Sequence, residues 1–422
     1  MLLIYRYLIN FFFPIIIIVI FFRKYLNKED KIRFKEKLFS SAYNINKNHN
    51  KKLIWIHAAS LGELKSAIPL IKKLNKEKKF DFLITTTTLS ASNLFSEELL
   101  SEKNITHRFF PIDKPSLVKE FLKKWSPNLI IFVESEVWPN FILEIKKNNI
   151  PLVLLNGRIT KKTFLRWNVM PKLAEKIFQS FDLCLPSSKE SKKYLEKLKV
   201  KNIKYLGNIK LAAENNIIAL NNENKEILRV NKFWCALSTH KEEEIFCLKT
   251  HLNIKKVYKD IITIIIPRHI DRAEKIKSSC EKFNLNCQIL SNGELIKKGK
   301  EIIIINSYGV TSTYLDLCKS VFIGKSMIKR LKLVGGQNPI EAAKLKCKIY
   351  HGPYVYNFEE IYELFNKYKI SEKVYDEEEL SMKITMDLSQ SNEINSKEIG
   401  TINSLGKKIL EDISNELDQI IN

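Results

Sequence analysis

Residues 53–74 read LIWIHAASLGELKSAIPLIKKL, and this segment predicts the fold class. The run up to His57 is almost entirely apolar, as expected of a strand that is buried on both faces. Ser60 and Gly62 allow a tight turn, after which apolar residues recur at helical spacing as far as Leu74. A buried strand followed at once by an amphipathic helix is the repeating unit of a parallel sheet covered by helices.

Short apolar runs alternate with amphipathic segments along most of the chain. The alternation pauses over residues 207–225, which are polar and rich in asparagine, and then resumes. The pattern predicts an α/β protein with two Rossmann-like domains that face a cleft. The expected strands are Leu53–His57, Phe82–Thr86, His107–Pro111, Leu129–Val133, Leu152–Asn156, Leu183–Leu185, Phe233–Leu237, Ile261–Ile266, Gln288–Leu290, Glu301–Asn306, Val321–Gly324 and Lys348–His351.

The same patterns predict where the parts of the chain begin and end. They are 1–24 for a membrane anchor, 25–48 for a basic juxtamembrane segment, 49–212 and 229–390 for the two Rossmann-like domains, 213–228 for the linker between them, and 391–422 for a terminal helix. That helix is expected to pack back on the first of the two domains.

The first 22 residues, MLLIYRYLINFFFPIIIIVIFF, carry a single charge, Arg6. At ~1.5 Å per residue a helix of this length reaches ~33 Å, enough to cross a hydrocarbon core ~30 Å thick. A cleaved signal peptide is the alternative, but the chain runs on into basic residues without a small-residue cleavage site. By the positive-inside rule, the excess of cations after the segment places the rest of the chain in the cytoplasm, against anionic headgroups.

The composition favours an anionic partner. The 422 residues include 70 lysines and arginines against 47 acidic residues, which gives a net charge of +23. Nucleic acid, anionic lipid and a phosphorylated substrate all fit this charge, although a biased base composition would also enrich lysine. Clusters of arginine interleaved with aromatic residues, typical of nucleic-acid readers, are missing. The seven cysteines form no C-x-x-C pair and so argue for a reducing compartment.

Glu63 is the first candidate for chemistry. It ends the segment HAASLGE, residues 57–63, where the first predicted strand gives way to a helix. Ligands of such sheets bind outside the carboxyl ends of the strands, and a carboxylate there could act as a general base. An acidic residue in the first turn of a helix also stabilises the helix dipole, and the spacing alone does not separate these two roles.

The segment VESEVWPN, residues 133–140, places Glu134 and Glu136 at the end of the fourth strand. On this motif alone, helix capping beside a buried tryptophan is favoured over catalysis. The sequence has no G-x-G-x-x-G after a strand and no Walker A loop, H-E-x-x-H helix or D-x-D motif. We therefore expect neither a dinucleotide cofactor nor a catalytic metal.

Three segments of the second half follow predicted strands. They are Pro267-Arg268-His269, Tyr308-Gly309 and GGQNPIEAA at residues 335–343. An arginine, a glycine turn and the start of a helix at one sheet edge predict a site for a phosphate and its nucleoside. Arg268 would pair with the phosphate and Glu341 with the ribose; a surface salt bridge and a helix-dipole contact are the alternatives.

Eight segments together resemble one known family. HAASLGE, TTTTLSAS, VESEVWPN, NGRIT, GNIK, STHKEEE, PRH and GGQNPIEAA occur in the order, and at roughly the spacings, of the 3-deoxy-D-manno-octulosonic acid (Kdo) transferases. The resemblance extends from the apolar N-terminal segment to beyond Gly352–Phe358. It implies a GT-B glycosyltransferase of lipopolysaccharide assembly.

The resemblance implies transfer of Kdo, with inversion, from CMP-Kdo to the lipid A precursor lipid IVA. The implied partners are these two substrates and anionic lipid of the inner membrane, without nucleic acid, cofactor or metal. A single-pass anchor would hold the catalytic body on the cytoplasmic side. In the matching motifs Glu63 is the base, and Glu134 and Lys210 stabilise the transition state. The implied CMP contacts are Pro267, Arg268, Tyr308, Gly309, Val310, Asn338, Pro339, Ile340 and Glu341.

The chain departs from the family pattern at several positions. The usual M-G-E reads Tyr308-Gly309-Val310, which removes a carboxylate near the nucleotide, and a usual histidine is replaced by Gln337. Leu211-Ala212 replaces F-D, and Lys325 stands where a glycine is usual. Two alternatives stay open: a GT-B transferase that uses another nucleotide sugar on a lipid acceptor, and a non-catalytic, membrane-tethered binder of acidic lipid.

Overall fold

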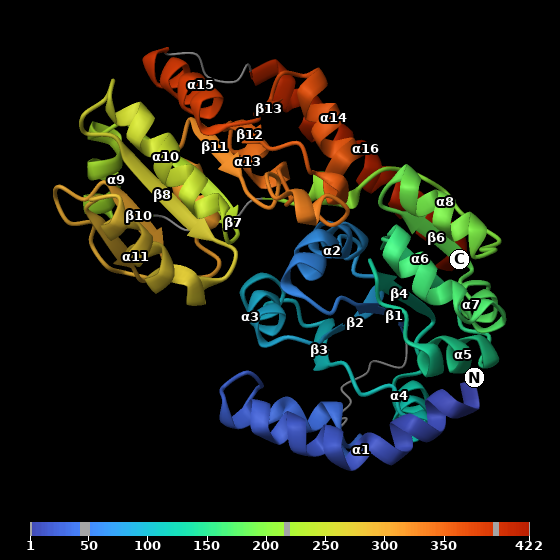
Figure 1. Ribbon diagram of the computed structural model, residues 1–422. Coiled ribbons are helices and arrows are strands. Elements are labelled where there is room, and N and C mark those ends of the chain that lie inside the picture. The colour runs from blue at the N-terminus through green and yellow to red at the C-terminus, as the bar shows by residue number, and fades with distance from the viewer. Residues whose placement is uncertain (1, 43–50, 215–219, 391–395, 422) are drawn as a thin grey trace. The chain divides into compact units, whose positions relative to one another are not determined.

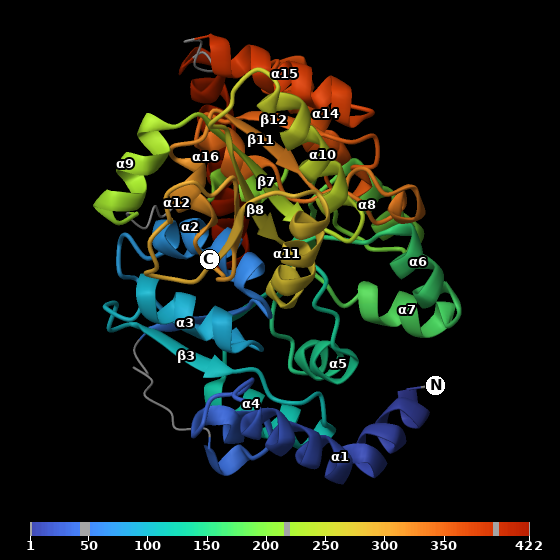
Figure 2. The ribbon, with the colours of Figure 1, turned by 60° about the vertical axis from the view of Figure 1, so that its left-hand side comes forward.

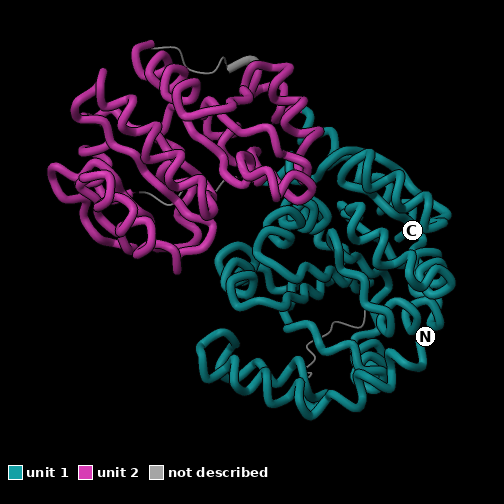
Figure 3. Tube along the Cα trace, viewed as in Figure 1, with its two compact units in different colours: residues 1–213, 405–422 teal, residues 214–404 magenta. Residues whose placement is uncertain are grey.

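The computed structural model describes residues 2–42, 51–214, 220–390 and 396–421. The chain forms two compact units, which Figure 3 colours separately. Unit 1 comprises Met1–Ala213 and Leu405–Asn422, and unit 2 comprises Glu214–Ser404. Unit 1 is therefore discontinuous in sequence, because its last segment follows the whole of unit 2.

Unit 1 is built on a parallel sheet of six strands (Figure 1). They are β1 (Lys52–His57), β2 (Phe80–Thr86), β3 (Ile105–Phe109), β4 (Leu129–Val133), β5 (Leu152–Gly157) and β6 (Leu183–Pro186). Their order is β3-β2-β1-β4-β5-β6. Ile56 of β1 pairs with Ile84 on one side and Ile131 on the other. The strand order thus reverses between β1 and β4, as in a Rossmann fold.

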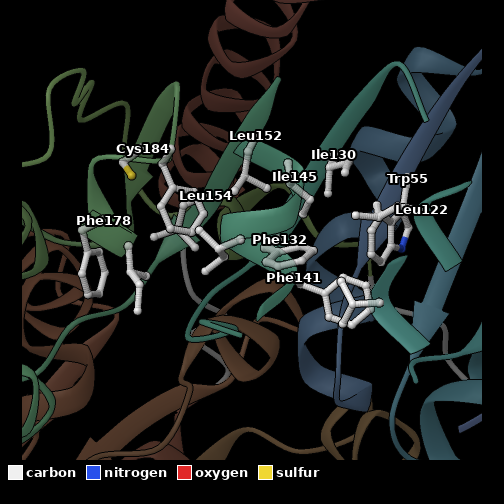
Figure 4. Close-up of a cluster of buried hydrophobic side chains, with 14 of the residues drawn as sticks. Trp55, Leu122, Ile130, Phe132, Phe141, Ile145, Leu152, Leu154, Phe178 and Cys184 are labelled. Carbon is white, nitrogen blue, oxygen red and sulfur yellow. The ribbon is translucent and has the colours of Figure 1, made fainter. Parts of the chain in front are cut away.

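Both faces of this sheet are covered, since all five residues of β4 are buried. Trp55, Phe132 and Phe141 share one hydrophobic cluster with the helices after β3 and β4 (Figure 4). The helices between the strands are α2 (Leu61–Leu74), α3 (Leu89–Glu98), α4 (Pro115–Trp125), α5 (Pro139–Lys147), α6 (Lys161–Asn168), α7 (Pro171–Phe178) and α8 (Lys189–Lys197), and the 3-10 turns are η1 (Arg33–Lys37), η2 (Ser40–Ala42) and η3 (Ile209–Ala212).

Unit 2 repeats the plan with a parallel sheet of seven strands. They are β7 (Phe233–Thr239), β8 (Ile262–Pro267), β9 (Cys287–Leu290), β10 (Ile302–Ile305), β11 (Ser320–Ile323), β12 (Lys348–His351) and β13 (Ser371–Lys373). Their order is β13-β12-β11-β7-β8-β10-β9, and it reverses between β7 and β11. The isoleucine runs of β8 and β10 are buried, and both strands have a neighbouring strand on each side.

Along the chain, the helices of unit 2 come before, between and after its strands (Figure 2). They are α9 (Asn222–Val230), α10 (Glu243–Lys255), α11 (Ala273–Lys282), α12 (Thr311–Leu315), α13 (Ile340–Lys344), α14 (Glu359–Lys367) and α15 (Glu377–Ser389), with 3-10 turns η4 (Ile270–Arg272), η5 (Lys329–Leu331) and η6 (Tyr356–Phe358). The last helix, α16 (Ser396–Ile421), belongs to unit 1 from Leu405 onward.

The predicted α/β architecture with two Rossmann-like domains is confirmed, while the cleft between them stays a prediction. All twelve predicted strands are present, with ends that shift by at most two residues. The short edge strand β13 was not predicted, because its sequence Ser-Glu-Lys carries no apolar signal. Of the predicted linker 213–228, residues 215–219 lie outside the described residues, and α9 begins within it at Asn222.

The N-terminal segment forms α1 (Leu2–Tyr25), a helix of 24 residues. An 18-residue window of α1 has a mean hydropathy of 2.2, and only 6% of that window is buried. By length and composition alone, α1 is able to cross a membrane.

Candidate active site

Three glutamates gather at the carboxyl edge of the sheet in unit 1. Glu63 follows β1, and Glu134 and Glu136 follow β4. Because β1 and β4 are neighbours and the strand order reverses between them, their carboxyl ends mark the place where open α/β sheets bind ligands. The charges of Glu136 and Glu134 act on Glu63, which shows that the three carboxyl groups lie close enough to interact.

Glu63 is held by the turn that leads from β1 into α2. Ser60 caps the helix, and its hydroxyl accepts a hydrogen bond from the Glu63 N–H at 3.4 Å. The Glu63 carboxylate turns back over the same turn, where Oε2 accepts from the Ala59 N–H at 2.7 Å. This is close to a capping box, and it fixes the direction of the carboxyl group.

The pKa of Glu63 is raised to about 7. Burial is the largest cause, followed by repulsion from Glu136 and Glu134, and the hydrogen bonds from Ala59 and Ser60 only partly oppose them. A residue that merely complements the helix dipole has its ionised form stabilised, which lowers its pKa. The raised pKa therefore favours the general base, because such a base works best when its pKa is near the operating pH.

Glu136 supplies a fixed negative charge beside Glu63. Its Oε2 accepts a hydrogen bond from Trp138 Nε1 at 2.8 Å and lies 3.1 Å from His57 Nε2. Burial alone would raise the pKa of Glu136, but the contacts with His57 and Trp138 outweigh it and lower the pKa. No role was predicted for His57. It ends β1, is fully buried and stacks on Phe110 with a centroid separation of 3.7 Å.

Glu134 forms an ion pair with Lys210. Lys210 Nζ lies 2.5 Å from Glu134 Oε1, and both side chains are mostly buried, with 18% and 11% exposed. Glu134 has a φ of +61°, in the left-handed region that non-glycine residues rarely adopt. Its backbone is held there by two hydrogen bonds, from its own N–H to Leu155 O and from Arg158 N–H to its carbonyl. Such enforced conformations cluster at functional sites.

Two asparagines position the backbone that carries Lys210. Asn208 caps the 3-10 turn η3, with its Oδ1 accepting from the Lys210 N–H at 3.0 Å. Asn156, in β5, accepts from the Ile209 N–H at 3.2 Å. These residues belong to the segments GNIK and NGRIT, so the two motifs meet here although they are about fifty residues apart in sequence.

Helix α16 supports the same turn from the other end of the chain. Gly406 packs so closely on η3 that a Cβ atom there would lie 2.2 Å from the Leu211 carbonyl oxygen. Farther along α16, Glu416 forms an ion pair with Lys204, whose Nζ lies 2.6 Å from the carboxylate. The terminal helix is thus part of the framework that positions Lys210, a role that amphipathicity alone did not reveal.

In unit 2, the predicted nucleotide contacts all follow carboxyl ends of parallel strands, so they share one edge of the second sheet. Pro267 ends β8 and is buried, whereas Arg268 is exposed and its N–H donates to Thr239 O at 3.1 Å. Tyr308, Gly309 and Val310 follow β10, and the Tyr308 side chain is 69% exposed. Asn338, Pro339, Ile340 and Glu341 lead into α13, where Asn338 Oδ1 accepts from the Ile340 N–H at 3.1 Å.

A buried glutamate that the sequence did not single out, Glu243, organises this edge. Its carboxylate accepts hydrogen bonds from the backbone N–H groups of His240, Lys325, Ser326 and Met327, at 2.6 to 3.0 Å. The loops after β7 and β11 are therefore tied together at the point where the strand order reverses. Lys325, which replaces a glycine of the family pattern, has a φ of +58°.

Two cations, Lys325 and Arg268, lie near His240 at this edge. Burial lowers the pKa of His240, and its neighbours Lys325, His269 and Arg268 lower it further, against a hydrogen bond to Ser238 O that raises it. The His240 and His269 rings meet edge to face, with centroids 5.8 Å apart. Cations that repel a protonated histidine stabilise an anion at the same place.

The structure therefore brings the predicted residues into two sets. Glu63, Glu134 and Lys210 share the sheet edge of unit 1, and the nine predicted CMP contacts share that of unit 2. Among the described residues, no group of three or more His, Cys, Asp or Glu side chains is arranged to hold a metal ion.

The sequence and the fold both match known proteins. A family profile described as 3-deoxy-D-manno-octulosonic-acid transferase (kdotransferase) matches residues 32–213. The 3-deoxy-D-manno-octulosonic acid transferase of Rickettsia bellii (strain RML369-C) is 33% identical over 354 residues, which are 83% of this chain and 82% of the relative. The enzyme of that name from Haemophilus influenzae is 28% identical over 324 residues, or 74% of this chain and 73% of the relative.

Among solved structures, a putative UDP-N-acetylglucosamine 2-epimerase from Listeria monocytogenes aligns with a TM-score of 0.59 and 14% identity. The alignment covers 87% of this chain and 97% of that one, and it shows the two-domain fold alone. The Rickettsia bellii relative shows the family as well as the fold, because its similarity is higher and spans most of both chains. The chain belongs to the 3-deoxy-D-manno-octulosonic acid transferase family, which are glycosyltransferases of lipopolysaccharide biosynthesis.

Proposed function

We propose that the protein transfers Kdo from CMP-Kdo to the lipid A precursor lipid IVA, with inversion at the anomeric carbon. The observation that carries this proposal is Glu63, a directed and mostly buried carboxyl group with a pKa of about 7 at the carboxyl edge of the sheet in unit 1. At neutral pH a substantial fraction of it is ionised and able to accept a proton.

In the proposed reaction Glu63 takes the proton from a hydroxyl group of the acceptor. The acceptor oxygen forms its bond to the anomeric carbon of Kdo as the bond from that carbon to the CMP phosphate breaks, and CMP leaves with the electron pair. Because attack and departure occur on opposite sides in one displacement, the configuration inverts. Repulsion from Glu136 and Glu134, part of what raises the pKa of Glu63, strengthens it as a base.

Lys210 and Glu134 are proposed to act as a charged pair near the reacting centre. Lys210 would offset negative charge that develops on the donor, and Glu134 keeps the ammonium group in place through the 2.5 Å contact. Fixed charges in a water-poor site stabilise a transition state without reorganising. The hydrogen bonds that Asn208 and Asn156 accept from the backbone of residues 210 and 209 would also help to position the lysine.

The edge of unit 2 is proposed to bind CMP. Arg268 would pair with the phosphate, and Glu341 would accept hydrogen bonds from the ribose, with Asn338, Pro339 and Ile340 beside it. Tyr308, Gly309 and Val310 would contact the nucleotide from the loop after β10. The positive charge around His240 supports an anionic ligand at this edge. Arg268 is exposed and carries its charge on a forked donor that suits phosphate.

We also propose that the protein acts at the inner membrane, with its catalytic body on the cytoplasmic side and with anionic lipid near its basic residues. The lipid acceptor requires a membrane-bound enzyme, and α1 is apolar and long enough to provide attachment. The single crossing expected from the sequence stays a prediction. A helix α1 that lies in the plane of the membrane surface is the alternative.

Incubation of the purified protein with CMP-Kdo and lipid IVA tests the proposal. Product mass, read by mass spectrometry, is expected to show addition of Kdo, and it also counts the units added. A parallel panel of UDP-sugars should give no product. Turnover with a UDP-sugar instead of CMP-Kdo would overturn the donor assignment, and salt-dependent lipid binding without turnover of any donor would overturn the reaction.

A further inference from the structure

One face of α1 is covered by unit 1 along the whole length of the helix. The partly or fully covered residues recur at helical spacing; they are Leu2, Tyr5, Arg6, Ile9, Phe13, Ile16, Ile17, Ile20 and Lys24. In the middle of the helix, Phe13, Ile16 and Ile17 pack with Ile112 and with the buried side chains Phe34 and Leu38. Both ribbon views show α1 lying beside α4 (Figures 1 and 2).

The first turn of α1 is attached to the body by specific polar contacts. Tyr5 donates to Asp113 Oδ2 at 2.8 Å, and Arg6 Nε donates to Asn140 Oδ1 at 2.9 Å. Asp113 is buried and also accepts from the N–H groups of Asn140 and Phe141, at the start of α5. The N-terminal turn of α1 is therefore joined to the helix that follows the site residues Glu134 and Glu136.

The other end of α1 is attached as well. Arg23 Nε donates to Glu29 Oε1 at 2.7 Å, and Glu29 pairs with the buried ammonium group of Lys37. Lys37 in turn donates to the carbonyl of Thr87, in the loop between β2 and α3, at 2.8 Å. The chain turns back sharply here, with Asn27 at a φ of +52°.

The opposite face of α1 is apolar and exposed. Its large side chains are Leu3, Ile4, Tyr7, Leu8, Phe11, Phe12, Ile15, Ile18, Val19 and Phe22. They recur at the i, i+3, i+4 and i+7 spacing of one helix face, and none carries a charge. A continuous apolar stripe of this size on a protein surface marks contact with a partner or a membrane.

These contacts conflict with a helix that crosses the bilayer. A crossing α1 that kept its contacts would carry Asp113, Asn140 and Lys37 into hydrocarbon, where charged and polar groups are strongly disfavoured. A crossing α1 that left these groups outside the bilayer would lose its polar contacts at both ends and its packing on unit 1. A helix that lies in the plane of the membrane surface keeps them all. Its apolar stripe enters the lipid, and the face that is usually polar in such helices is covered here by protein.

We infer that α1 lies flat in the interface of an anionic lipid bilayer, with the stripe Leu3–Phe22 in the lipid and both helix ends on the same side. Exposed Lys28, Lys31 and Lys35 follow the helix and fit anionic headgroups. For the proposed reaction, which this inference does not require, an in-plane helix would hold the sheet edge of unit 1 at a fixed height above the lipid.

Photo-crosslinking of the full chain in anionic proteoliposomes tests the geometry. The neighbouring residues Phe12 and Phe13 lie on opposite faces, the exposed and the packed one, so p-benzoylphenylalanine at each position forms a matched pair. The Phe13 variant is expected to crosslink to the peptide containing Ile112 and Lys114, whose ammonium group lies 3.9 Å from the Phe13 ring centroid. The Phe12 variant should give lipid adducts. Lipid adducts at both positions would overturn the inference.

A topology measurement gives a second test that leaves the packed face intact. A short extension with one cysteine is placed ahead of Met1, and a membrane-impermeant maleimide is applied to sealed vesicles. The reference is Lys193→Cys, at an exposed position of α8. An in-plane helix predicts that both cysteines label from the same side. Labelling of the extension from the opposite side shows a crossing and refutes the in-plane helix. Neither experiment measures sugar transfer, so failure here is distinct from failure of the proposed reaction.

Discussion

The carboxyl edges of the two sheets share a topology but differ in chemistry. In unit 1 the edge gathers carboxylates, and their mutual repulsion and burial raise the pKa of Glu63. In unit 2 the equivalent edge places two cations, Lys325 and Arg268, near His240, whose pKa is lowered by burial and by its neighbours. In each unit the surroundings therefore disfavour the charged form of the titratable residue: the anionic form of Glu63 in unit 1 and the protonated form of His240 in unit 2. The first is suited to taking up a proton and the second to holding an anion.

The two edges also use a buried glutamate in opposite ways. Glu243 accepts four backbone hydrogen bonds and serves the loops after β7 and β11. Glu63 accepts one backbone hydrogen bond, from Ala59, and a second hydrogen bond from the Ser60 side chain. A glutamate saturated by backbone donors organises structure, whereas we propose that a glutamate with fewer backbone donors, such as Glu63, takes part in proton transfer. The contrast suggests variants that affect one edge and spare the other.

Glu63→Gln should have the largest effect. Loss of a general base typically lowers the rate ~10²–10⁴-fold, so we expect kcat to fall by that order while KM for CMP-Kdo changes little. Steady-state kinetics with CMP-Kdo and lipid IVA measure both. Glu77→Gln, at an exposed site where the carboxylate pairs with Lys79, is the matched control. Near-normal turnover of a folded Glu63→Gln protein would refute the role of Glu63 as base.

The difference in folding stability between Glu63→Gln and the wild type should depend on pH. The folded pKa of Glu63, about 7, lies above the ordinary value of 4.5, so the unfolded chain loses this proton first. Between these pH values the wild type loses stability as the pH rises, and above pH 7 the full loss is on the order of 3 kcal/mol. Glu63→Gln should therefore be more stable than wild type at pH 8 and about equal below pH 4.5. Urea denaturation across this range tests it; an equal difference at every pH would contradict it.

Arg268→Ala is expected to weaken the donor edge alone. A hydrogen-bonded charge contact contributes ~1.5–3 kcal/mol, so KM for CMP-Kdo should rise about 10–100-fold, while the pH at half-maximal kcat, set by Glu63, stays in place. Arg229→Ala removes the same charge from an exposed site in the last turn of α9 and should leave KM unchanged. Equal losses in the two variants would point to overall charge rather than a phosphate contact.

Lys325→Gly should give the smallest change, a gain in stability of about 1 kcal/mol or less. The left-handed conformation costs an L-residue ~1–2 kcal/mol, and glycine avoids this cost at Lys325 but loses more backbone entropy on folding. Lys332, with a φ of −50°, provides the control, because glycine there should only destabilise. Thermal melts of both variants measure the effect, and destabilisation by Lys325→Gly would show that the lysine side chain makes contacts that outweigh the strain.

Most of the fold was predictable because buried parallel strands leave a strong local signal. The run Ile261–Ile266 has no other plausible place than the inside of a sheet. The edge strand β13 lacked that signal, since its three residues are polar and only Ser371 is buried. A terminal helix was predicted within residues 391–422, but the packing of α16 on η3 depends on the absence of a side chain at Gly406, which amphipathic spacing does not report.

The candidate site was predictable where sequence motifs carry it. Glu63, Glu134 and Lys210 came from motifs and meet at one edge, whereas Glu136 and Glu243 were read as capping or left without a role. Their importance arises from burial and from partners far away in sequence, such as His57 and Met327. The acidic repeat in STHKEEE was the one available signal for Glu243.

The return of α16 to unit 1 has a consequence for biogenesis. Residues 405–421 emerge from the ribosome only after all of unit 2, while α1 emerges first and is free to meet lipid. The segment that supports Lys210 is therefore completed only after unit 2 has been synthesised. Since domains generally fold as units during synthesis, we expect unit 1 to reach its final packing around Lys210 after unit 2 has left the ribosome.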